Sequence, residues 1–382
     1  MQALPPALPQ GAAIGRWRDA LRSWRHGLIA SPRFQHFAAR FPLTRPIAAR
    51  KARALFDLAT GFVHTQVLAA CVELDLFELL ARRPRGVAEV AEACRLPRDS
   101  ALRLLRAAAS LGLLEERGEG RFGLGDLGAA LRGNPGVAAM VRHHAMLYGD
   151  LRDPVALLRG EGRPTALQTY WAYAGARARP GEDGPGDAEV ARYTALMAAS
   201  QQLVAADILD AWPVERHRRI MDVGGGDGSF LRAVAARAPL AELVLFDLPA
   251  VAARAAGAGG RIACVGGDFT RDPLPPGADL ITLVRIGHDH DDPVLRRLFA
   301  RIFEALAPGG TLLIGEPMAG QRGAEAMADA YFGFYFLAMG QGRARRPAEI
   351  AAILAEAGFV GARQRPTPRP LLTCVMAARK PL

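Results

Sequence analysis

Short apolar runs alternate with amphipathic runs from residue 218 to the C-terminus. The apolar runs have the length and composition of buried strands, and the runs between them have helical spacing. This alternation predicts an α/β fold with a doubly wound, mainly parallel sheet and right-handed crossovers. A helix and two closing strands, near 359–365 and 371–378, bring the predicted sheet to seven strands. The five earlier strands are RRIMDV, AELVLFDLP, RIACVGGDF, DLITLVRI and TLLIGEP.

Upstream of the predicted sheet the pattern is mostly helical. The run FVHTQVLAACVELDLFELLA predicts one long helix, and two further helices follow it, the second with Asp99 or Ser100 as its expected cap. Two short segments around Gly118 and Gly120 then complete the order of a winged-helix domain. Residues 136–212 are predicted to be mostly helical, with a Gly- and Pro-rich loop at 175–187. The predicted division is an arm (1–54), a winged-helix domain (55–135), a helical connector (136–215) and an α/β domain (216–382).

The N-terminal arm carries a separate pattern. Apolar residues recur at spacings of three and four, bordered by arginines, which predicts an amphipathic helix. Two interpretations remain open: the helix packs against protein, or it lies in a membrane interface, where Trp faces the apolar side and Arg the polar side. The apolar stripe consists of Ile14, Trp17, Leu21, Trp24 and Leu28.

Charge is concentrated in the same arm. The 382 residues carry a formal charge of +10, and residues 1–60 hold ten basic residues against two acidic ones, a net of +8. The other 322 residues hold 38 basic and 36 acidic residues, a net of +2. The protein is therefore not a uniformly basic nucleic-acid binder. A DNA-reading helix also needs an exposed polar face, and SALRLLRAAASLGLL offers only Arg103 and Arg106, so we expect no nucleic-acid partner.

Cysteine usage and the N-terminus bear on location. Four scattered cysteines form no CxxC or CxxH unit, which argues against a structural zinc site and fits a reducing cytoplasm. Arginines interrupt the N-terminal segment, so we expect no secretory signal. We find no stretch of about 18 or more apolar residues and expect no membrane-spanning helix. The expected location is the cytoplasm, with peripheral attachment to the inner face of the membrane as an open alternative.

The first candidate site is the glycine-rich loop DVGGGDG after the first predicted strand. It places Asp222 two residues before Gly224, with Gly226 next in a G-x-G-x-G spacing. Glycines let a backbone turn tightly and approach a ligand closely. The second strand ends in Asp247, placed to accept hydrogen bonds from two ribose hydroxyls.

The third predicted strand adds an acid and an aromatic ring. It ends in Asp268 and Phe269, which suit the amino group and the face of an adenine. Together the three strand ends favour a nucleoside without a pyrophosphate, as in S-adenosylmethionine, over a nicotinamide cofactor. Glycines that merely turn the chain would leave the two acids unexplained.

The second candidate site is RIGHDHDD at the end of the fourth strand. A neutral His288 there can take a proton from a hydroxyl that attacks a donated methyl group. Glu316, at the end of the next strand, can orient the imidazole as the carboxylate of a triad does. Two other interpretations remain: Asp291 or Asp292 caps the following helix, or the acids bind a cation. The cation ligands would be Asp289, Asp291 and Asp292.

A third feature is the aromatic run DAYFGFYFLAMG at 329–340. A helix this rich in aromatic residues is expected to be buried on more than one face. It is either core or the wall of a long apolar substrate pocket. The predicted pocket residues are Tyr193, Met197, Tyr331, Phe332 and Tyr335.

These motifs resemble a known family. MDVGGGDGSF, LFDLPAV, GGDFTRDPLP, RIGHDHDD and APGGTLLIGEP are similar to those of class I S-adenosylmethionine-dependent O-methyltransferases with an N-terminal winged-helix dimerisation domain. The resemblance implies a Rossmann-like fold, a homodimer and no metal. It also implies that His288 is the general base, flanked by Asp289 and Glu316. The implied cofactor-binding residues are Asp222, Gly224, Gly226, Asp247, Leu248, Asp268, Phe269 and Arg285.

Within this family the chain resembles the branch that methylates the tertiary 1-hydroxyl of acyclic carotenoids. Segments such as LVRIGHDHDD and PRPLLTCVMAARK carry that resemblance, which implies an apolar hydroxylated carotenoid as substrate. Two positions depart from the wider family: His290 replaces a usual Trp, and Ala344 replaces a usual second Glu. The alternative substrate is a phenolic or polyketide natural product, and the absence of the second Glu weighs against it.

Overall fold

The computed structural model describes residues 10–174, 201, 203–257, 260–370 and 372–382. The chain forms two compact units, one built from residues 1–74 and 85–122 and the other from 75–84 and 123–382. The arm and the helices that follow it fall in the same unit, and the four-part division expected from the sequence stays a prediction.

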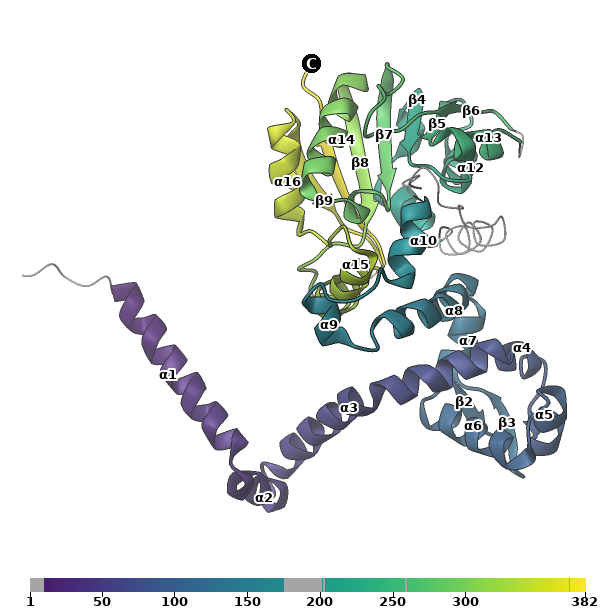
Figure 1. Ribbon diagram of the computed structural model, residues 1–382, viewed down its shortest axis with the longest axis vertical. Coiled ribbons are helices and arrows are strands. Elements are labelled where there is room, and N and C mark those ends of the chain that lie inside the picture. Colours follow the sequence, from purple (N-terminus) through teal and green to yellow (C-terminus); the bar gives the residue numbers. More distant parts are fainter. Residues whose placement is uncertain (1–9, 175–200, 202, 258–259, 371) are drawn as a thin grey trace, which may run out of the picture. The chain divides into compact units, whose positions relative to one another are not determined.

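The first unit is mainly helical and ends in a small antiparallel sheet (Figure 1). Its three strands pair in the order β1-β3-β2, and the turn between β2 and β3 has positive φ at Gly118 and Gly120, as the hairpin prediction requires. The helices are α1 (Gln10–Ala30), α2 (Pro32–Arg40), α3 (Arg45–Glu73), α5 (Val87–Ala93) and α6 (Arg98–Ser110). The strands are β1 (Arg85–Gly86), β2 (Leu114–Glu116) and β3 (Arg121–Leu124).

Two local expectations for this region are wrong. The single long helix expected from Phe62 onward ends at Glu73, because Asp75 adopts a left-handed conformation with φ 48° and separates α3 from the short α4 (Leu76–Leu79). Helix α6 already begins at Arg98, so Asp99 lies inside its first turn and Pro97 takes the N-cap position without a side-chain cap.

Helix α3 is exposed along much of its length. By length and composition it could cross a membrane, and only 11% of its most apolar window is buried. This finding differs from the expectation that no such stretch exists, because isolated polar residues such as Asp57, Thr60 and His64 interrupt the apolar run only sparsely. A helix of this kind also occurs in proteins where another protein surface covers it.

The second unit contains a seven-stranded sheet in the order β6-β5-β4-β7-β8-β10-β9. The strands from β4 to β8 pair in parallel, and β10 runs antiparallel to both β8 and β9. The predicted doubly wound, mainly parallel sheet is confirmed. Its strands are β4 (Arg219–Val223), β5 (Glu242–Asp247), β6 (Ile262–Gly266), β7 (Ala278–Val284), β8 (Leu306–Glu316), β9 (Val360–Arg365) and β10 (Cys374–Arg379).

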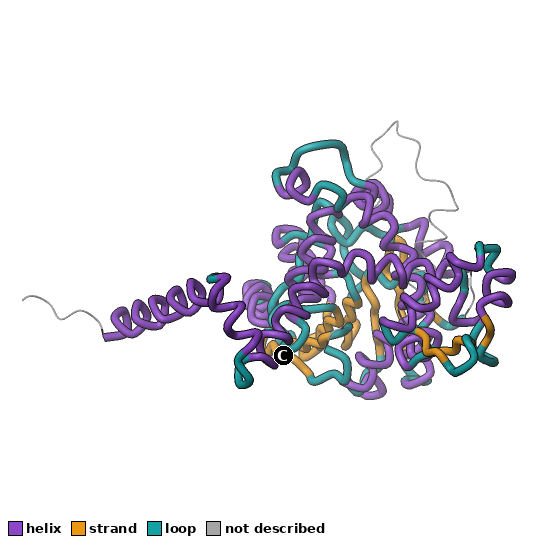
Figure 2. Tube along the Cα trace, turned by 90° about the horizontal axis from the view of Figure 1, so that it is seen from below, coloured by secondary structure: helices purple, strands orange, loops and turns teal. Residues whose placement is uncertain are grey.

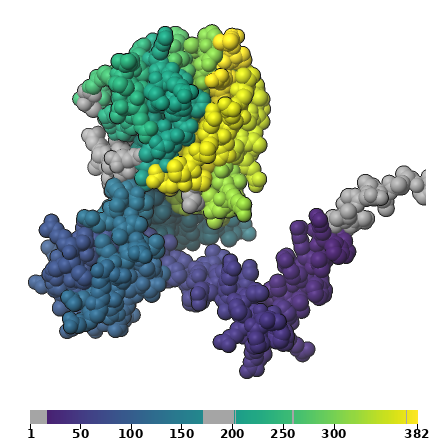
Figure 3. All heavy atoms as spheres, turned by 180° about the vertical axis from the view of Figure 1, so that it is seen from behind, coloured from purple at the N-terminus to yellow at the C-terminus, as the bar shows by residue number. Residues whose placement is uncertain are grey.

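Helices cover both faces of this sheet, so the strands lie between helical layers (Figure 2). One apolar core joins the sheet to α14 (Asp292–Ala305) and α16 (Pro347–Glu356). The other joins it to helical residues 203–211, α12 (Ser229–Arg237) and α13 (Pro249–Gly257). The C-terminal residues, yellow in Figure 3, lie along one side of the unit, as the pairing of β10 with β8 requires.

Further helices of the second unit precede the sheet in the chain. They are α7 (Asp126–Arg132), α8 (Pro135–Asp150), α9 (Pro154–Leu158) and α10 (Ala166–Ala174), as the helical pattern of this region predicts. A third apolar cluster joins α8 and α10 to α15 (Gly333–Met339). The loop predicted at 175–187 lies outside the described residues.

Candidate active site

The two central strands are joined by a buried hydrogen bond at the point where the sheet changes direction. Strands β4 and β7 are neighbours, and the chain winds outward from them on both sides. The Thr282 hydroxyl on β7 donates to Oδ1 of Asp222 on β4 over 2.6 Å. Burial raises the pKa of Asp222 to about 7, and this hydrogen bond opposes the shift. Ligands of doubly wound sheets bind at such a switch point, beyond the carboxyl ends of the strands.

Two positions of the glycine loop next to Asp222 leave no room for a side chain. A Cβ at Gly224 would lie 2.4 Å from the Cδ1 of Ile286, and a Cβ at Gly225 would lie 2.8 Å from a carboxylate oxygen of Asp222. Gly224 and Gly226 also have φ of 74° and 59°, which favours glycine. The loop is therefore a bare backbone surface at the end of β4.

Asp247 ties this loop to the next strand. Its carboxylate accepts hydrogen bonds from the backbone nitrogens of Gly226 at 2.8 Å and Leu248 at 2.7 Å. A carboxylate oxygen can accept more than one bond, so acceptor capacity remains for two ribose hydroxyls. The bare glycine loop beside a fixed acid fits the nucleoside part of S-adenosylmethionine, which the sequence predicted.

The end of β6 supplies the acid and the ring expected to meet the adenine. Oδ1 of Asp268 accepts hydrogen bonds from both the backbone nitrogen and the hydroxyl of Thr270, at 2.8 and 2.6 Å. The Phe269 ring meets His290 edge to face, with centroids 5.3 Å apart. His290, the residue that departs from the family pattern, thus links this strand end to the loop of His288.

His288 is 5% exposed and lies in the 3-10 turn Gly287–Asp289 after β7. Its Nε2 lies 3.3 Å from Oδ1 of Asp289, and its Nδ1 has no hydrogen-bond partner within the described residues. Burial, reinforced by the positive charge of Arg285, lowers the pKa of His288 to about 3. The imidazole is therefore neutral and able to accept a proton.

The two carboxyl groups around His288 have different partners. Glu316, at the end of β8, accepts a 3.0 Å hydrogen bond from the backbone nitrogen of His288, where the sequence predicted a contact with the ring. Asp289 is the carboxyl group nearest the imidazole. Burial raises the pKa of Glu316 to about 7 and that of Asp289 to about 8.

Arg285 precedes this turn and has an unusual backbone. Its φ is 61°, in a region that a residue with a long side chain adopts only at a cost of roughly 1–3 kcal/mol. Its backbone nitrogen donates to Gly315 on β8 at 2.9 Å, which holds the strained residue in place. Strain of this kind is concentrated at functional sites, which supports the inclusion of Arg285 among the predicted site residues.

Two arginines that follow α15 bind the loop after β7 that carries His288. Arg345 is fully buried and donates to the carbonyls of Gly287 at 2.9 Å and His290 at 2.6 Å. It also pairs with Asp292 at 2.7 Å, and the more exposed Arg343 pairs with Asp292 at 3.1 Å. Sequence reasoning missed the role of Arg345, because nothing in the residue's type or spacing marks it as buried.

The same contacts bear on the capping interpretation of the acidic run. Asp291 takes the N-cap position of α14 without a side-chain cap, and its carboxylate accepts from the backbone nitrogen of Gly342 at 3.0 Å. Asp291 thus occupies the predicted N-cap position, but no side-chain cap forms, because the carboxylates of Asp291 and Asp292 bind the segment after α15. Among the residues that the structure describes, no group of three or more His, Cys, Asp or Glu side chains is arranged to hold a metal ion.

The aromatic run forms a π-helical turn, η3 (Ala326–Phe332), followed by α15. Phe332 and Phe336 face His288, with ring centroids 6.0 and 5.3 Å from its own. Tyr331 and Tyr335 instead hydrogen bond to two histidines of α8. Burial on more than one face is confirmed, and Ala344 packs against the same apolar cluster. The predicted pocket residues Tyr193 and Met197 lie outside the described residues.

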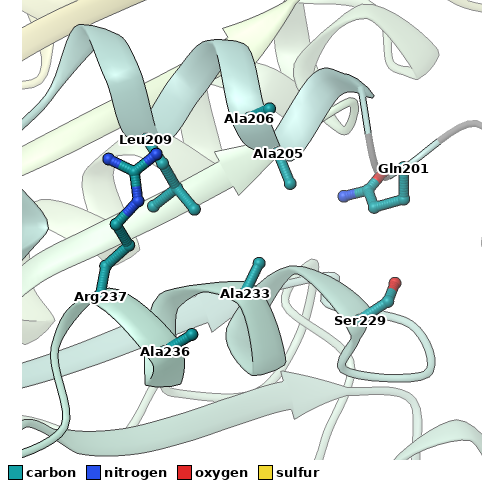
Figure 4. A pocket seen from close by; sticks show the side chains of 8 residues that line it. All are labelled: Gln201, Ala205, Ala206, Leu209, Ser229, Ala233, Ala236 and Arg237. Atoms are coloured by element: carbon teal, nitrogen blue, oxygen red, sulfur yellow. The ribbon is translucent and has the colours of Figure 1, made fainter.

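A separate cavity of about 370 Å³ opens between α12 and the helical residues 201 and 203–209 (Figure 4). Small side chains such as Ala205 and Ala233 line it, with Ser229 and Arg237 at its borders. It shares no residue with the His288 loop.

Comparisons with known proteins show which family the chain resembles. The O-methyltransferase domain matches residues 148–360, and the O-methyltransferase dimerisation domain matches residues 56–132. The chain is 43% identical to demethylspheroidene O-methyltransferase of Cereibacter sphaeroides, over 100% of this chain and 99% of that protein. The enzyme of the same name from Rhodobacter capsulatus is 43% identical over 99% of this chain and 94% of its own length. The structure of human N-acetylserotonin methyltransferase in complex with SAM aligns with a TM-score of 0.71 and 27% identity, covering 87% of this chain and 98% of that one.

The chain belongs to the S-adenosylmethionine-dependent O-methyltransferases that carry an N-terminal dimerisation domain. It is an O-methyltransferase, and S-adenosylmethionine is its cofactor. The fold and the family predicted from the sequence are thereby confirmed, and the roles of individual site residues remain predictions.

Proposed function

We propose that this protein transfers a methyl group from S-adenosylmethionine to the tertiary 1-hydroxyl of an acyclic carotenoid. The observation that carries the proposal is 43% identity over the full chain to demethylspheroidene O-methyltransferase. The apolar surroundings of His288 support it, because Phe332 and Phe336 pack directly against the imidazole. An acyclic polyene needs such an apolar wall and offers few polar groups to bind.

The cofactor would lie across the carboxyl ends of β4, β5 and β6. S-adenosylmethionine supplies an electrophilic methyl group on a sulfonium. The bare backbone of Gly224 and Gly226 would approach its nucleoside, and Asp247 would accept from the ribose hydroxyls. Asp268 and Phe269 would meet the adenine, with Leu248 and Arg285 as further contacts. Asp222 would support the glycine loop from the β4 side. Its carboxylate lies against the loop and accepts a hydrogen bond from the Thr282 hydroxyl.

His288 would serve as the general base through Nδ1. When Asp289 is ionised it accepts a hydrogen bond from the Nε2–H of the imidazole, which leaves the lone pair on Nδ1, the nitrogen without a partner in the described residues. A tertiary alcohol is a very weak acid, so proton removal would accompany or follow formation of the carbon–oxygen bond. A general base of this kind contributes about 10²–10⁴-fold to the rate.

An acceptor panel tests the proposed substrate. Purified protein with radiolabelled S-adenosylmethionine would be offered an acyclic 1-hydroxycarotenoid in detergent, the same carotenoid without the hydroxyl, and a set of phenols and polyketides. We expect label only in the 1-hydroxycarotenoid. Label confined to the phenols or polyketides would refute the carotenoid assignment while leaving the O-methyltransferase activity intact.

The first unit would form a homodimer through α3. Its large exposed apolar side chains include Leu55, Phe56, Leu58 and Phe62, each at least 65% exposed. The dimerisation-domain match begins at residue 56 and therefore includes most of this stripe. A second copy of the chain would cover these side chains, and we do not assign α3 as a membrane span. Analytical ultracentrifugation of the wild type and of Phe62→Glu tests this, with a monomer expected only for the variant.

The arm before α3 would rest on an anionic membrane surface, on the cytoplasmic side. Trp17 and Trp24 on α1 are 68% and 65% exposed, and the same helix carries Arg18, Arg22 and Arg25. Exposed Trp together with Arg suits the boundary between headgroups and acyl chains. A carotenoid dissolved in lipid would then be close to the enzyme.

Vesicle binding tests the proposed role of the arm. We expect Trp17→Ala/Trp24→Ala to reduce sedimentation with vesicles that contain phosphatidylglycerol, and added salt to weaken binding of the wild type. Leu240→Ala is the matched control, because Leu240 is 97% exposed in the second unit. Equal binding by the two variants would count against the arm, as would binding to neutral vesicles that salt does not change.

A further inference from the structure

Two histidines outside the proposed mechanism bind the aromatic run next to His288. On α8, Nε2 of His143 lies 2.7 Å from the Tyr335 hydroxyl. Nε2 of the next residue, His144, lies 2.9 Å from the Tyr331 hydroxyl. The two tyrosines are four residues apart, so consecutive histidines hold consecutive turns of the aromatic helix.

The aromatic residues form two neighbouring stripes. Tyr331 and Tyr335 meet the histidines of α8, and each is followed in sequence by a phenylalanine. Those phenylalanines, Phe332 and Phe336, stack on each other with centroids 5.5 Å apart. Their rings are the ones that meet the imidazole of His288. One stripe therefore contacts α8, and the next one contacts the proposed base.

Adjacent side chains of a helix cannot move independently, since their directions are fixed by the same backbone. Two hydrogen bonds one turn apart fix both the height of this helix and its rotation about its own axis. We propose that His143 and His144 are positioning residues for methyl transfer, which hold Phe332 and Phe336 against His288 through the two tyrosines. This inference rests on the proposed role of His288 as the base.

Both hydrogen bonds join neutral partners. Burial lowers the pKa of His143 to about 4 and that of His144 below its ordinary value, and it raises the pKa of Tyr331 to about 12. The pairs therefore satisfy four polar groups without placing a charge in the apolar cluster. Tyr331 also donates a hydrogen bond to the sulfur of Met140 at 3.5 Å, and the test uses the shorter of the two histidine–tyrosine pairs, His143 and Tyr335.

The first measurement separates rate from binding. Single-turnover methyl transfer to a 1-hydroxycarotenoid in detergent would be compared for the wild type, His143→Leu and His143→Gln, together with S-adenosylmethionine affinity. We expect His143→Leu to lower the transfer rate constant by about 10–100-fold at unchanged cofactor affinity, because small displacements at a reacting centre cost that much. Glutamine can still hydrogen bond to the Tyr335 hydroxyl, so His143→Gln is expected to recover most of the rate.

A double variant distinguishes positioning from the avoidance of an unpaired polar group. His143→Leu/Tyr335→Phe removes both members of this hydrogen bond, so neither one faces an apolar replacement. If the pair positions the helix, the double variant regains thermal stability relative to His143→Leu and stays slow. Full recovery of the transfer rate in the double variant would overturn the inference, as would an unchanged rate in His143→Leu.

His288→Gln keeps this test separate from the proposed function. A full transfer rate in His288→Gln would refute the base assignment, whatever the histidines of α8 do. A slow His288→Gln together with a full rate in His143→Leu would refute only the positioning role.

Discussion

Oε2 of Glu316 accepts a hydrogen bond from the backbone nitrogen of His288 over 3.0 Å, while Nδ1 of the same residue has no partner among the described residues. Glu316 therefore fixes the loop that carries the base and leaves the imidazole to Asp289. This division separates two tasks that a single carboxylate performs in a serine-protease triad.

Replacing Glu316 by Gln is expected to slow methyl transfer without weakening cofactor binding. The amide keeps one acceptor oxygen but adds donors that face the backbone nitrogens of the loop, so the loop shifts. We expect a loss of about 10–100-fold in kcat. Glu242→Gln, an exposed position on the same sheet, is the control. A weakened affinity for S-adenosylmethionine at unchanged kcat would contradict this role.

The rate is expected to rise with pH through the titration of Asp289. Its pKa is raised to about 8, so at pH 6.5 it is largely protonated and can donate to Nε2 of His288. Above that pKa it accepts from Nε2–H and leaves Nδ1 as the basic nitrogen. Asp289→Asn can accept from Nε2–H at every pH, so its kcat profile between pH 6.5 and 9 is expected to be flat. A rising limb that persists in the variant would assign the titration to another group.

The two arginines that bind Asp292 are expected to differ sharply in their effect on stability. Arg345→Met removes the buried guanidinium hydrogen bonds to the carbonyls of Gly287 and His290, each worth about 1.5–3 kcal/mol because the donor is charged. Arg343 is 42% exposed, and Arg343→Met is expected to cost about 1 kcal/mol or less. Urea unfolding measures both, and equal effects would show that burial does not set the difference.

Asp222→Asn isolates the pH dependence of one buried carboxyl. Burial raises the folded-state pKa of Asp222 from an ordinary 3.8 to about 7. The folded state therefore holds a proton that the unfolded state releases, and the free energy of unfolding falls as pH rises from about 4 to about 7. Asparagine does not titrate. The free energy of unfolding of Asp222→Asn, relative to that of the wild type, is therefore expected to increase over that range by up to about 4 kcal/mol. A difference that does not change with pH would contradict the shift.

The order of strands and helices in the second unit was predictable because strand ends, glycines and helical spacing are local signals. The approximate positions of Asp247, Asp268, His288 and Glu316 at strand ends follow from the same pattern. Their exact partners do not follow, since Glu316 binds the main chain of residue 288 where a contact with the ring was expected. Which partner a side chain binds depends on small shifts in the position of the loops, and no residue pattern encodes those positions.

The contributions of α8 and of Arg345 were not predictable for a different reason. His143 and Tyr335 are 192 residues apart, and a histidine in an amphipathic helix is usually an ordinary helix residue. Arg345 lies in an arginine-rich segment, where each member would be assigned to the surface. Only the tertiary packing shows which of these side chains is enclosed.

The π-helical turn sets the direction in which the aromatic side chains of this run point. A π-turn holds about one residue more than an α-turn, and η3 ends at Phe332. If these residues formed a regular α-helix with none removed, the part of the run that follows would rotate by about 100° relative to the part before it. The tyrosines would then exchange directions with their neighbours although every aromatic residue was still present. The wall beside His288 is thus defined by the spacing of this segment as much as by its composition, and an alignment that ignores a single gap would misassign both stripes.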